Sequence, residues 1–172
     1  MIPIVQEGEK VLRQKAKPVD LEAIPSKEIK KILNDMKKAL HATSDGVAIA
    51  APQIGVSLQI FIVAGKVFDI QDGIYEEDKP AVHPDQVYIN PEITKLSRKK
   101  EEMEEGCLSV RGVYGKIKRS NKATVTAYDE TGKKFSRGGS GLLAQIFQHE
   151  TDHLLGTLFI DTAYELKTVT MN

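Results

Sequence analysis

The strongest constraint in this sequence is an H-E-x-x-H pattern, which runs from His149 to His153. Residues four apart lie on one face of a helix, so the two imidazoles can reach one metal ion while Glu150 projects beside them as a general base. Ser140 is a suitable helix cap upstream, and Gly156 is a suitable stop downstream. The pattern therefore predicts a metal-binding helix.

This helix is expected to carry its polar groups on an apolar face. Positions 142, 146, 149, 150 and 153 form one stripe at helical spacing, which places the imidazoles and the carboxylate beside buried Leu142 and Ile146. Polar groups on such a face need partners, and a metal ion would satisfy them. Asp152 lies off this face, and it either pairs with Arg119 or remains an exposed carboxylate.

A catalytic zinc-type site needs a third protein ligand and one open position for water. The candidates are Cys107, which is the only cysteine, together with His41, His83 and several carboxylates. A lone cysteine is often only a small buried apolar side chain. However, Gly106 lets the backbone approach a ligand closely, and Cys-His-His is a recognised catalytic ligand set. Cys107 is therefore the favoured third ligand.

A third segment, Gly46 to Gly55, consists of small and apolar residues and includes one polar amide, Gln53. Small side chains let the backbone approach a ligand, and one amide on an apolar wall suits a binding pocket. Taken alone, the segment is better explained as a tight core loop before the strand that begins at Leu58.

Together, the three segments closely resemble the signature motifs of the peptide deformylases, enzymes that remove the N-formyl group from nascent bacterial-type polypeptides. The motifs read GVAIAAPQIG, EGCLS and QHETDHLLG, in that order, and the resemblance spans nearly the whole chain. By this resemblance, Glu150 matches the catalytic acid/base, and Gln53 and the backbone N–H of Leu108 match the groups that hold the formyl oxygen. The matching metal ligands are Cys107, His149 and His153.

The resemblance also implies cofactors, partners and a substrate pocket. Ferrous iron is the implied physiological metal, with zinc or nickel able to occupy the site in purified protein. The implied partners are N-formylmethionyl nascent peptides and, transiently, the ribosome. The implied substrate-pocket residues are Val47, Ala48, Gly106, Tyr114, Gln145 and Ile146.

Three positions depart from the family pattern. Ala48 replaces a common glycine, Arg111 replaces a common proline, and Gln145 replaces an apolar residue of the methionine pocket. Arg111 loses a fixed φ and adds a charge near the mouth of the cleft. All the chemical groups are present, so these changes predict altered specificity or efficiency and a more polar pocket.

Composition limits the remaining function classes. The 24 basic and 24 acidic residues balance, which argues against a membrane or sequence-specific nucleic-acid partner. One cysteine excludes an internal disulfide and fits a reducing compartment, and residues 1–10 lack the features of a signal peptide. We therefore expect one catalytic domain over residues 1–172 in a soluble cytoplasmic protein, long enough to bury roughly 70% of its unfolded surface.

Strand groups interrupted by two helices predict an α+β fold, with mainly antiparallel sheets packed around a central metal-binding helix. The first of these helices is amphipathic, and its lysines are expected to form a solvated face; the second is the H-E-x-x-H helix. The polar stretch 65–85 is expected to be an exposed loop, or alternatively a lid over the cleft. The other expected elements are a helix over 26–41 and strands over 58–64, 86–90, 123–128, 133–137 and 157–161.

Two other functions share parts of this pattern. A zinc peptidase of the H-E-x-x-H type would cleave internal amide bonds and usually takes histidine or glutamate as its third ligand. A binding module would hold the metal structurally or bind N-terminal peptides without turnover. Structural zinc sites normally have four protein ligands, whereas only three convincing candidates are present besides Glu150.

Overall fold

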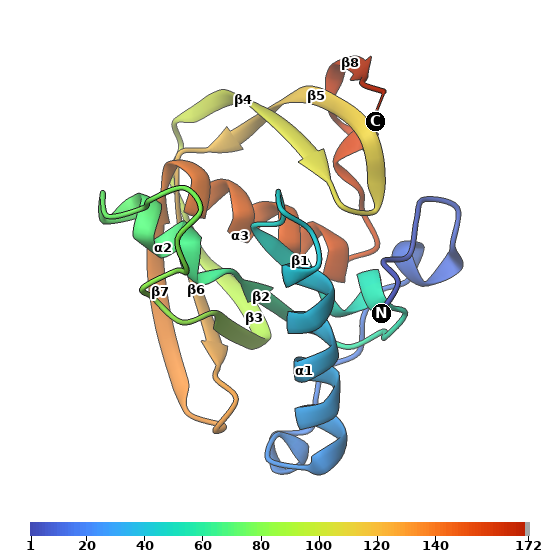
Figure 1. Cartoon of the computed structure of the whole chain (residues 1–172), viewed down its shortest axis with the longest axis vertical. Coiled ribbons are helices and arrows are strands. Elements are labelled where there is room, and N and C mark those ends of the chain that lie inside the picture. Colours follow the sequence, from blue (N-terminus) through green and yellow to red (C-terminus); the bar gives the residue numbers. More distant parts are fainter. Residues whose placement is uncertain (171–172) are drawn as a thin grey trace.

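Two antiparallel sheets enclose a helix in the computed structural model, which describes residues 1–170 (Figure 1). The last two positions of the expected domain, 171 and 172, lie outside the described residues. Within the described range, the first sheet has five strands in the order β1-β2-β3-β6-β7, and the second has three in the order β4-β5-β8. The expected α+β class, with antiparallel sheets around a central helix, is confirmed.

The strands of the two sheets are interspersed with helices along the chain. The first sheet contains β1 (Ala48–Ala50), β2 (Ile60–Val63), β3 (Gln86–Leu96), β6 (Lys122–Tyr128) and β7 (Lys134–Ser140). The second contains β4 (Lys100–Cys107), β5 (Val110–Ser120) and β8 (Tyr164–Thr168). The α-helices are α1 (Lys27–His41), α2 (Gly65–Gln71) and α3 (Gly141–Leu154), and the short 3-10 helices are Lys10–Arg13, Leu21–Ala23, Ala51–Ile54 and Phe159–Asp161.

The two larger of three apolar clusters lie on opposite faces of the first sheet, and β2 contributes to both. Phe61 and Val63 belong to the apolar cluster that includes Phe147 of α3. Ile60 and Ile62 point the other way, into the cluster that includes residues of α1. Successive strand residues face opposite sides of a sheet, so the apolar run of β2 is buried on both faces. The first sheet thus separates α1 from α3.

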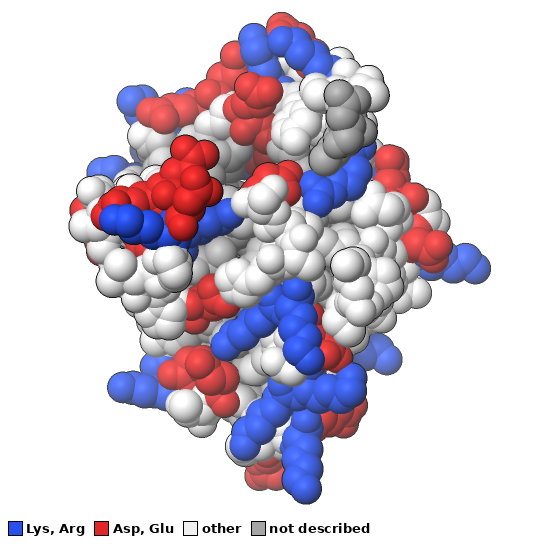
Figure 2. All heavy atoms as spheres, viewed as in Figure 1, with Lys and Arg blue, Asp and Glu red and all other residues white. Residues whose placement is uncertain are grey.

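Helix α1 packs as its apolar spacing predicts. The Ser26 side chain accepts a hydrogen bond from the backbone N–H of Ile29, and Ile29, Leu33 and Met36 are buried. Figure 2 shows basic side chains gathered over the lower part of the visible face, where Figure 1 places α1. The helix contributes Lys27, Lys30, Lys31, Lys37 and Lys38.

Helix α3 is fixed against β5 through Gln148. The amide of this buried residue accepts a hydrogen bond from the Ser120 N–H (3.0 Å) and donates one to the Ser120 carbonyl (2.9 Å). Ser140 occupies the expected N-cap position, although its side chain makes no capping hydrogen bond there. At the other end, Gly156 adopts a φ of 78°, in the left-handed region that favours glycine.

Three sequence expectations are corrected. Strand β3 continues through Pro91 rather than ending there, because Asn90 adopts a φ of 50° and the register with β6 is irregular between Ile89 and Glu92. Residues 157–161 form no strand: residues 159–161 make a 3-10 helix, and the Asp161 carboxylate accepts the Leu158 N–H (3.1 Å).

The third correction concerns residues 65–85, because the first seven of them form helix α2 rather than loop. The rest of the segment returns to this helix, where the Asp69 carboxylate accepts the N–H groups of Val82 (2.8 Å) and His83 (3.0 Å). These bonds fix the end of the segment against α2.

The long β4–β5 hairpin was not among the expected elements. Its first strand reads KEEMEEGC, in which charged residues predominate. The sequence therefore lacks the alternation of apolar and polar residues that marks a half-buried strand. Residues from Lys100 to Gly106 pair in regular register with β5, and the register shifts between Gly106 and Cys107. This hairpin carries Cys107 to α3.

Candidate metal centre

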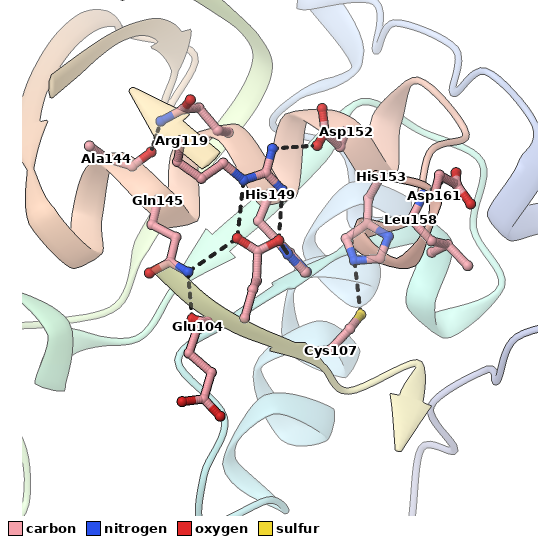
Figure 3. Close-up of polar contacts among 12 residues, drawn as sticks. Glu104, Cys107, Arg119, Ala144, Gln145, His149, Asp152, His153, Leu158 and Asp161 are labelled. Atoms are coloured by element: carbon pink, nitrogen blue, oxygen red, sulfur yellow. Dashed lines mark hydrogen bonds and ion pairs between the residues drawn. The ribbon is translucent and has the colours of Figure 1, made fainter. Parts of the chain in front are cut away.

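The structure brings Cys107, His149 and His153 together (Figure 3). Cys107 ends β4, and both histidines lie on α3, with one candidate ligand atom from each residue within 4.8 Å of the others. The Cys107 Sγ lies 3.3 Å from His153 Nε2, and the backbone N–H of Ser109 points at the sulfur over 3.4 Å. One thiol and two imidazoles form a site that is consistent with one divalent metal ion.

The other two histidines considered as third ligands lie elsewhere. His41 Nε2 pairs with Asp85 at 2.7 Å, and His83 Nδ1 pairs with Asp69 at 2.6 Å. Among residues 1–170, the Cys-His-His trio is the group of three or more potential ligands that meets the distance requirement for one ion.

Glu105 is a site residue that the sequence analysis missed. Its carboxylate lies 2.8 Å from His149 Nδ1, which directs the other ring nitrogen, Nε2, away from Glu105. The same carboxylate accepts two hydrogen bonds from Arg119, at 3.1 and 2.6 Å, and one from the Gln145 amide, at 3.2 Å. The sequence carried no clear signal for this role, because β4 is not recognisable as a strand and its register shifts between Gly106 and Cys107.

Asp152 pairs with Arg119, which decides between its two interpretations. The Arg119 Nη1 donates to the Asp152 carboxylate over 2.7 Å, while its other nitrogens hold Glu105. Arg119 is 8% exposed, so water screens these charges weakly. The guanidinium thus joins β4 and β5 to α3 directly behind His149 (Figure 3).

The site shifts the pKa values of its two buried carboxyl groups, Glu105 and Glu150, in opposite directions. Burial favours the neutral form of Glu105, but hydrogen bonds and charges from His149 and Arg119 outweigh it and lower the pKa of Glu105 to about 2. Burial raises the pKa of Glu150 to about 7, against the opposing charge of His149. Glu105 is therefore a fixed anion, whereas Glu150 can gain or lose a proton near neutral pH.

The pKa values of the two imidazoles, His149 and His153, are also shifted in opposite directions. Burial opposes the charged form of His149, but contact with Cys107 and Glu105 raises its pKa well above the usual value. Burial and the neighbouring charge of His149 lower the pKa of His153 well below it. Within residues 1–170, the buried side-chain atoms without a hydrogen-bond partner are Glu150 Oε2 and His153 Nδ1. The acceptor of Glu150 is thus available beside the proposed ligands.

A cavity of about 250 Å³ opens beside the histidines. In the described chain, it lies between the edge strand of one sheet, β1, and the edge strand of the other, β4. All six residues expected to form the substrate pocket line it, as do Gln53, Leu108 and Glu150. Those six are Val47, Ala48, Gly106, Tyr114, Gln145 and Ile146.

Two pocket residues differ in detail from the sequence expectation. Leu142 is 38% exposed and lines the cavity rather than being buried. Gln145 is the polar residue expected there, but its amide nitrogen is directed to the Glu104 carbonyl (2.9 Å) and the Glu105 carboxylate. Gln145 therefore also supports the group behind His149.

Gln53 is held rigidly at the wall of the cavity. Its carbonyl oxygen accepts the Ala50 N–H at 2.8 Å, and its amide nitrogen donates to Ser109 Oγ at 3.1 Å. The same nitrogen lies 3.7 Å from Cys107 Sγ. An amide donor thus sits beside the metal centre, on a side chain that is 1% exposed.

Comparison with known proteins identifies the family. The model of the polypeptide deformylase family matches residues 1–169. The chain belongs to the peptide deformylase family. Peptide deformylase 2 of Clostridium acetobutylicum is 39% identical over 157 residues, which is 91% of each chain. Peptide deformylase 1A, chloroplastic/mitochondrial, of Arabidopsis thaliana is 40% identical over 165 residues, covering 92% of this chain and 60% of its own.

Solved peptide deformylase structures share this fold. The Met-Ala-Ser-bound class I type b enzyme of Acinetobacter baumannii superposes with a TM-score of 0.79 at 31% identity, covering 93% of this chain and 97% of its own. Family membership confirms the expected hydrolase function, removal of the N-formyl group from nascent peptides, and the Cys-His-His site is present. No helix in the described residues is long and apolar enough to cross a membrane.

Proposed function

We propose that this peptide deformylase acts on N-terminal formyl-methionine, with Cys107, His149 and His153 holding one divalent metal ion and Glu150 moving the proton. One observation supports this assignment most strongly. The three potential ligand atoms lie within 4.8 Å of one another. Glu150 lies on α3 with the two histidines, and it lines the same cavity as Cys107 and His149. Three protein ligands leave a coordination position open for catalysis.

The metal ion, when bound, supplies a Lewis acid that polarises the formyl carbonyl and lowers the pKa of water. Glu150 accepts the proton of the attacking water and delivers it to the departing amine, because one positioned carboxyl group can serve both steps. The Gln53 amide and the Leu108 N–H donate hydrogen bonds to the formyl oxygen as negative charge develops there. Such donors are worth about 3 kcal/mol each in other hydrolases.

The remaining cavity residues would hold the methionine side chain. Ile146 and Val47 provide apolar contact, and Tyr114 and Gly106 form the opposite wall. An alanine at position 48 adds a methyl group where glycine would let the substrate backbone come closer. We therefore expect Ala48 to alter substrate affinity rather than the rate of the chemical step.

The test is formate release from formyl-Met-Ala-Ser by metal-loaded protein, with Glu150→Gln in parallel. We expect release by the parent protein and a loss of about 10²- to 10⁴-fold in the variant. Metal content, measured on the same samples, should be equal in both. Full activity of Glu150→Gln would refute the assigned base, and cleavage of unformylated peptides would instead indicate a zinc peptidase. Metal and peptide binding without any formate release would indicate a binding module.

We propose ferrous iron as the physiological ion, with zinc or nickel able to occupy the purified protein. Cysteine and histidine accept several divalent ions, so availability contributes to selection. Formate release per bound ion, compared under anaerobic conditions after loading with each metal, tests this order. Higher activity with zinc than with iron would refute it.

We further propose a cytoplasmic protein that meets its substrate while transiently associated with the ribosome. A thiol that serves as a metal ligand requires a reducing compartment, which supports this location. Co-sedimentation with translating ribosomes at low and high salt tests the association. Recovery in an organelle fraction, as the name of the Arabidopsis relative indicates for that protein, would refute the location.

A further inference from the structure

The two residues proposed to hold the formyl oxygen belong to different sheets. Gln53 lies in the 3-10 helix that follows β1 of the first sheet, and Leu108 lies in the turn between β4 and β5 of the second. Such donors stabilise developing charge only when each lies about 2.7–3.1 Å from the oxygen that carries it. Their effect therefore depends on the contacts that fix the distance between these two segments.

The turn that carries Leu108 is not of the kind that short hairpins favour. Leu108 and Ser109 form it, between Cys107 and Val110, which pair across the hairpin. Two-residue hairpin turns are favoured when their residues have positive φ, because that conformation matches the twist of the strands. Neither Leu108 nor Ser109 has a positive φ. Contacts from outside the hairpin are therefore needed to hold this turn.

The N-terminal segment supplies those contacts. The Gln6 side-chain amide donates to the Leu108 carbonyl at 3.0 Å, and the Glu7 N–H donates to the Ser109 carbonyl at 2.8 Å. The backbone N–H of Arg111 donates to the Gln6 side-chain oxygen at 3.4 Å, a contact that a proline at position 111 could not make. One segment thus binds both carbonyl groups of the turn and the start of β5.

The same segment also binds the backbone of Gln53. The Val5 N–H donates to the Gln53 carbonyl at 2.8 Å. A further bond from the Gln6 amide nitrogen to the Ile4 carbonyl, at 3.2 Å, orients the Gln6 side chain. Within residues 1–170, no residue before Asp45 lines the cavity, so the segment contacts both donor-bearing segments from outside the cavity.

We propose that Gln6 is a positioning residue for deformylation: together with the neighbouring backbone, it holds the Leu108–Ser109 turn at a fixed distance from Gln53. This inference rests on the proposed function, in which the Gln53 amide and the Leu108 N–H bind the formyl oxygen. Interactions that strengthen only as charge develops contribute to kcat rather than to KM. Loss of the Gln6 contacts should therefore slow turnover without weakening substrate binding.

The test replaces Gln6 by methionine, which keeps the length of the side chain but removes both hydrogen-bonding groups. With metal-loaded protein and formyl-Met-Ala-Ser, we expect kcat to fall about three- to ten-fold, the factor that corresponds to one net hydrogen bond, while KM is unchanged. Gln6→Glu keeps the acceptor for the Arg111 N–H but cannot donate to the Leu108 carbonyl, so its kcat should fall at least as far.

Binding of the product peptide, Met-Ala-Ser, distinguishes the positioning of the donors from a general change in the pocket. This peptide has no formyl oxygen, so its inhibition constant should be the same in Gln6→Met and in the parent protein. Metal content should also be equal, because Gln6 contacts the turn and not the ligand side chains.

Gln59→Met is the matched control. The Gln59 side-chain amide also donates to a backbone carbonyl of the N-terminal region, that of Ala16, at 3.2 Å. In the described structure, Gln59 does not line the cavity, and its amide makes no hydrogen bond to Gln53 or Leu108. The kcat of this variant should equal that of the parent protein.

The outcomes separate this inference from the function on which it rests. Unchanged kcat in Gln6→Met, or full activity of Gln6→Glu, would refute the positioning role and leave the deformylase function intact. A changed inhibition constant for Met-Ala-Ser or a loss of bound metal would also refute it, because Gln6 would then act on the pocket or on Cys107. So would an equal fall of kcat in Gln59→Met. No formate release by the parent protein would overturn the proposed function and this inference with it.

Discussion

At the scale of single residues, the geometry of the metal centre depends on Glu105. Its carboxylate accepts hydrogen bonds from Arg119 and Gln145 while facing Nδ1 of His149. Such a contact fixes the tautomer of a ligand histidine and the orientation of its ring, so that Nε2 is left for the metal. The ring of His149 is thus set before any ion arrives.

We expect Glu105→Gln to weaken metal binding by about 10- to 100-fold, the usual effect of removing the partner of a ligand histidine. Competition with a chromogenic chelator measures this affinity directly. Glu104→Gln is the control, since the side chain of this neighbour is exposed and only its backbone carbonyl contacts Gln145. Equal affinities in the two variants would show that the Glu105 contact does not position His149.

The grouping of Cys107, His149 and His153 could be predicted from the sequence, whereas the position of Glu105 beside His149 was not predicted. The relative position of the two histidines follows from their spacing, because residues four apart on a helix share one face. Cys107 was identified from the chemistry of the ligand set. The role of Glu105 depends on β4, a strand whose charged sequence conceals its conformation.

At the scale of elements, the end of α3 shows how local conformation places the ligand helix. Gly156 has a φ of 78°, and a Cβ atom there would lie 2.6 Å from the Arg13 carbonyl oxygen. The helix therefore ends against the N-terminal segment. The sequence predicted this stop from the glycine itself, but not the close contact, which joins residues far apart along the chain.

We expect Gly156→Ala to destabilise the protein more than Gly132→Ala does. Both glycines have positive φ, which costs an L-residue about 1–2 kcal/mol, but a Cβ at Gly132 would meet no other described atom within 4 Å. The steric conflict at Gly156 should add about 1–3 kcal/mol. Urea unfolding of both variants measures the difference, and equal free energies of unfolding would show that the contact relaxes without cost.

Elements with strong local signals were predicted correctly, and those that depend on tertiary context were not. The capped helix α1 and the hairpin of β6 and β7 follow from periodicity and turn residues. The strand after Asn90 was missed because Pro91 ordinarily ends a ladder, and here an irregular register accommodates it. Helix α2 was missed because its seven residues are too few for a clear period.

At the scale of the whole molecule, the first sheet links both core layers. Phe61 and Ile62 are adjacent in β2 and fully buried in different clusters, one beside α3 and the other beside α1. Neither layer can lose its packing without exposing one face of this strand. We therefore propose that residues 1–172 form a single cooperative domain.

We expect one unfolding transition. Far-ultraviolet circular dichroism reports on the helices, and fluorescence of the five tyrosines reports on packing, since the chain has no tryptophan. Coincident urea midpoints for the two probes would support a two-state process. Separate midpoints would show that the layers unfold independently. Bound metal should raise both midpoints together, because an ion that binds only the folded state stabilises all of it.

The two-sided burial of β2 also limits how this chain can change in length. Deleting or inserting one residue in Ile60–Val63 would reverse the direction of every later side chain in the strand. Side chains that now pack in one apolar cluster would then point into the other. Helix α3 packs on one of these faces, so such a change would disturb the packing of the helix that carries His149 and His153 without altering either residue. Length variation among functional descendants of this sequence should therefore occur in the polar connections, such as residues 72–85 and 129–133, and be absent from β2.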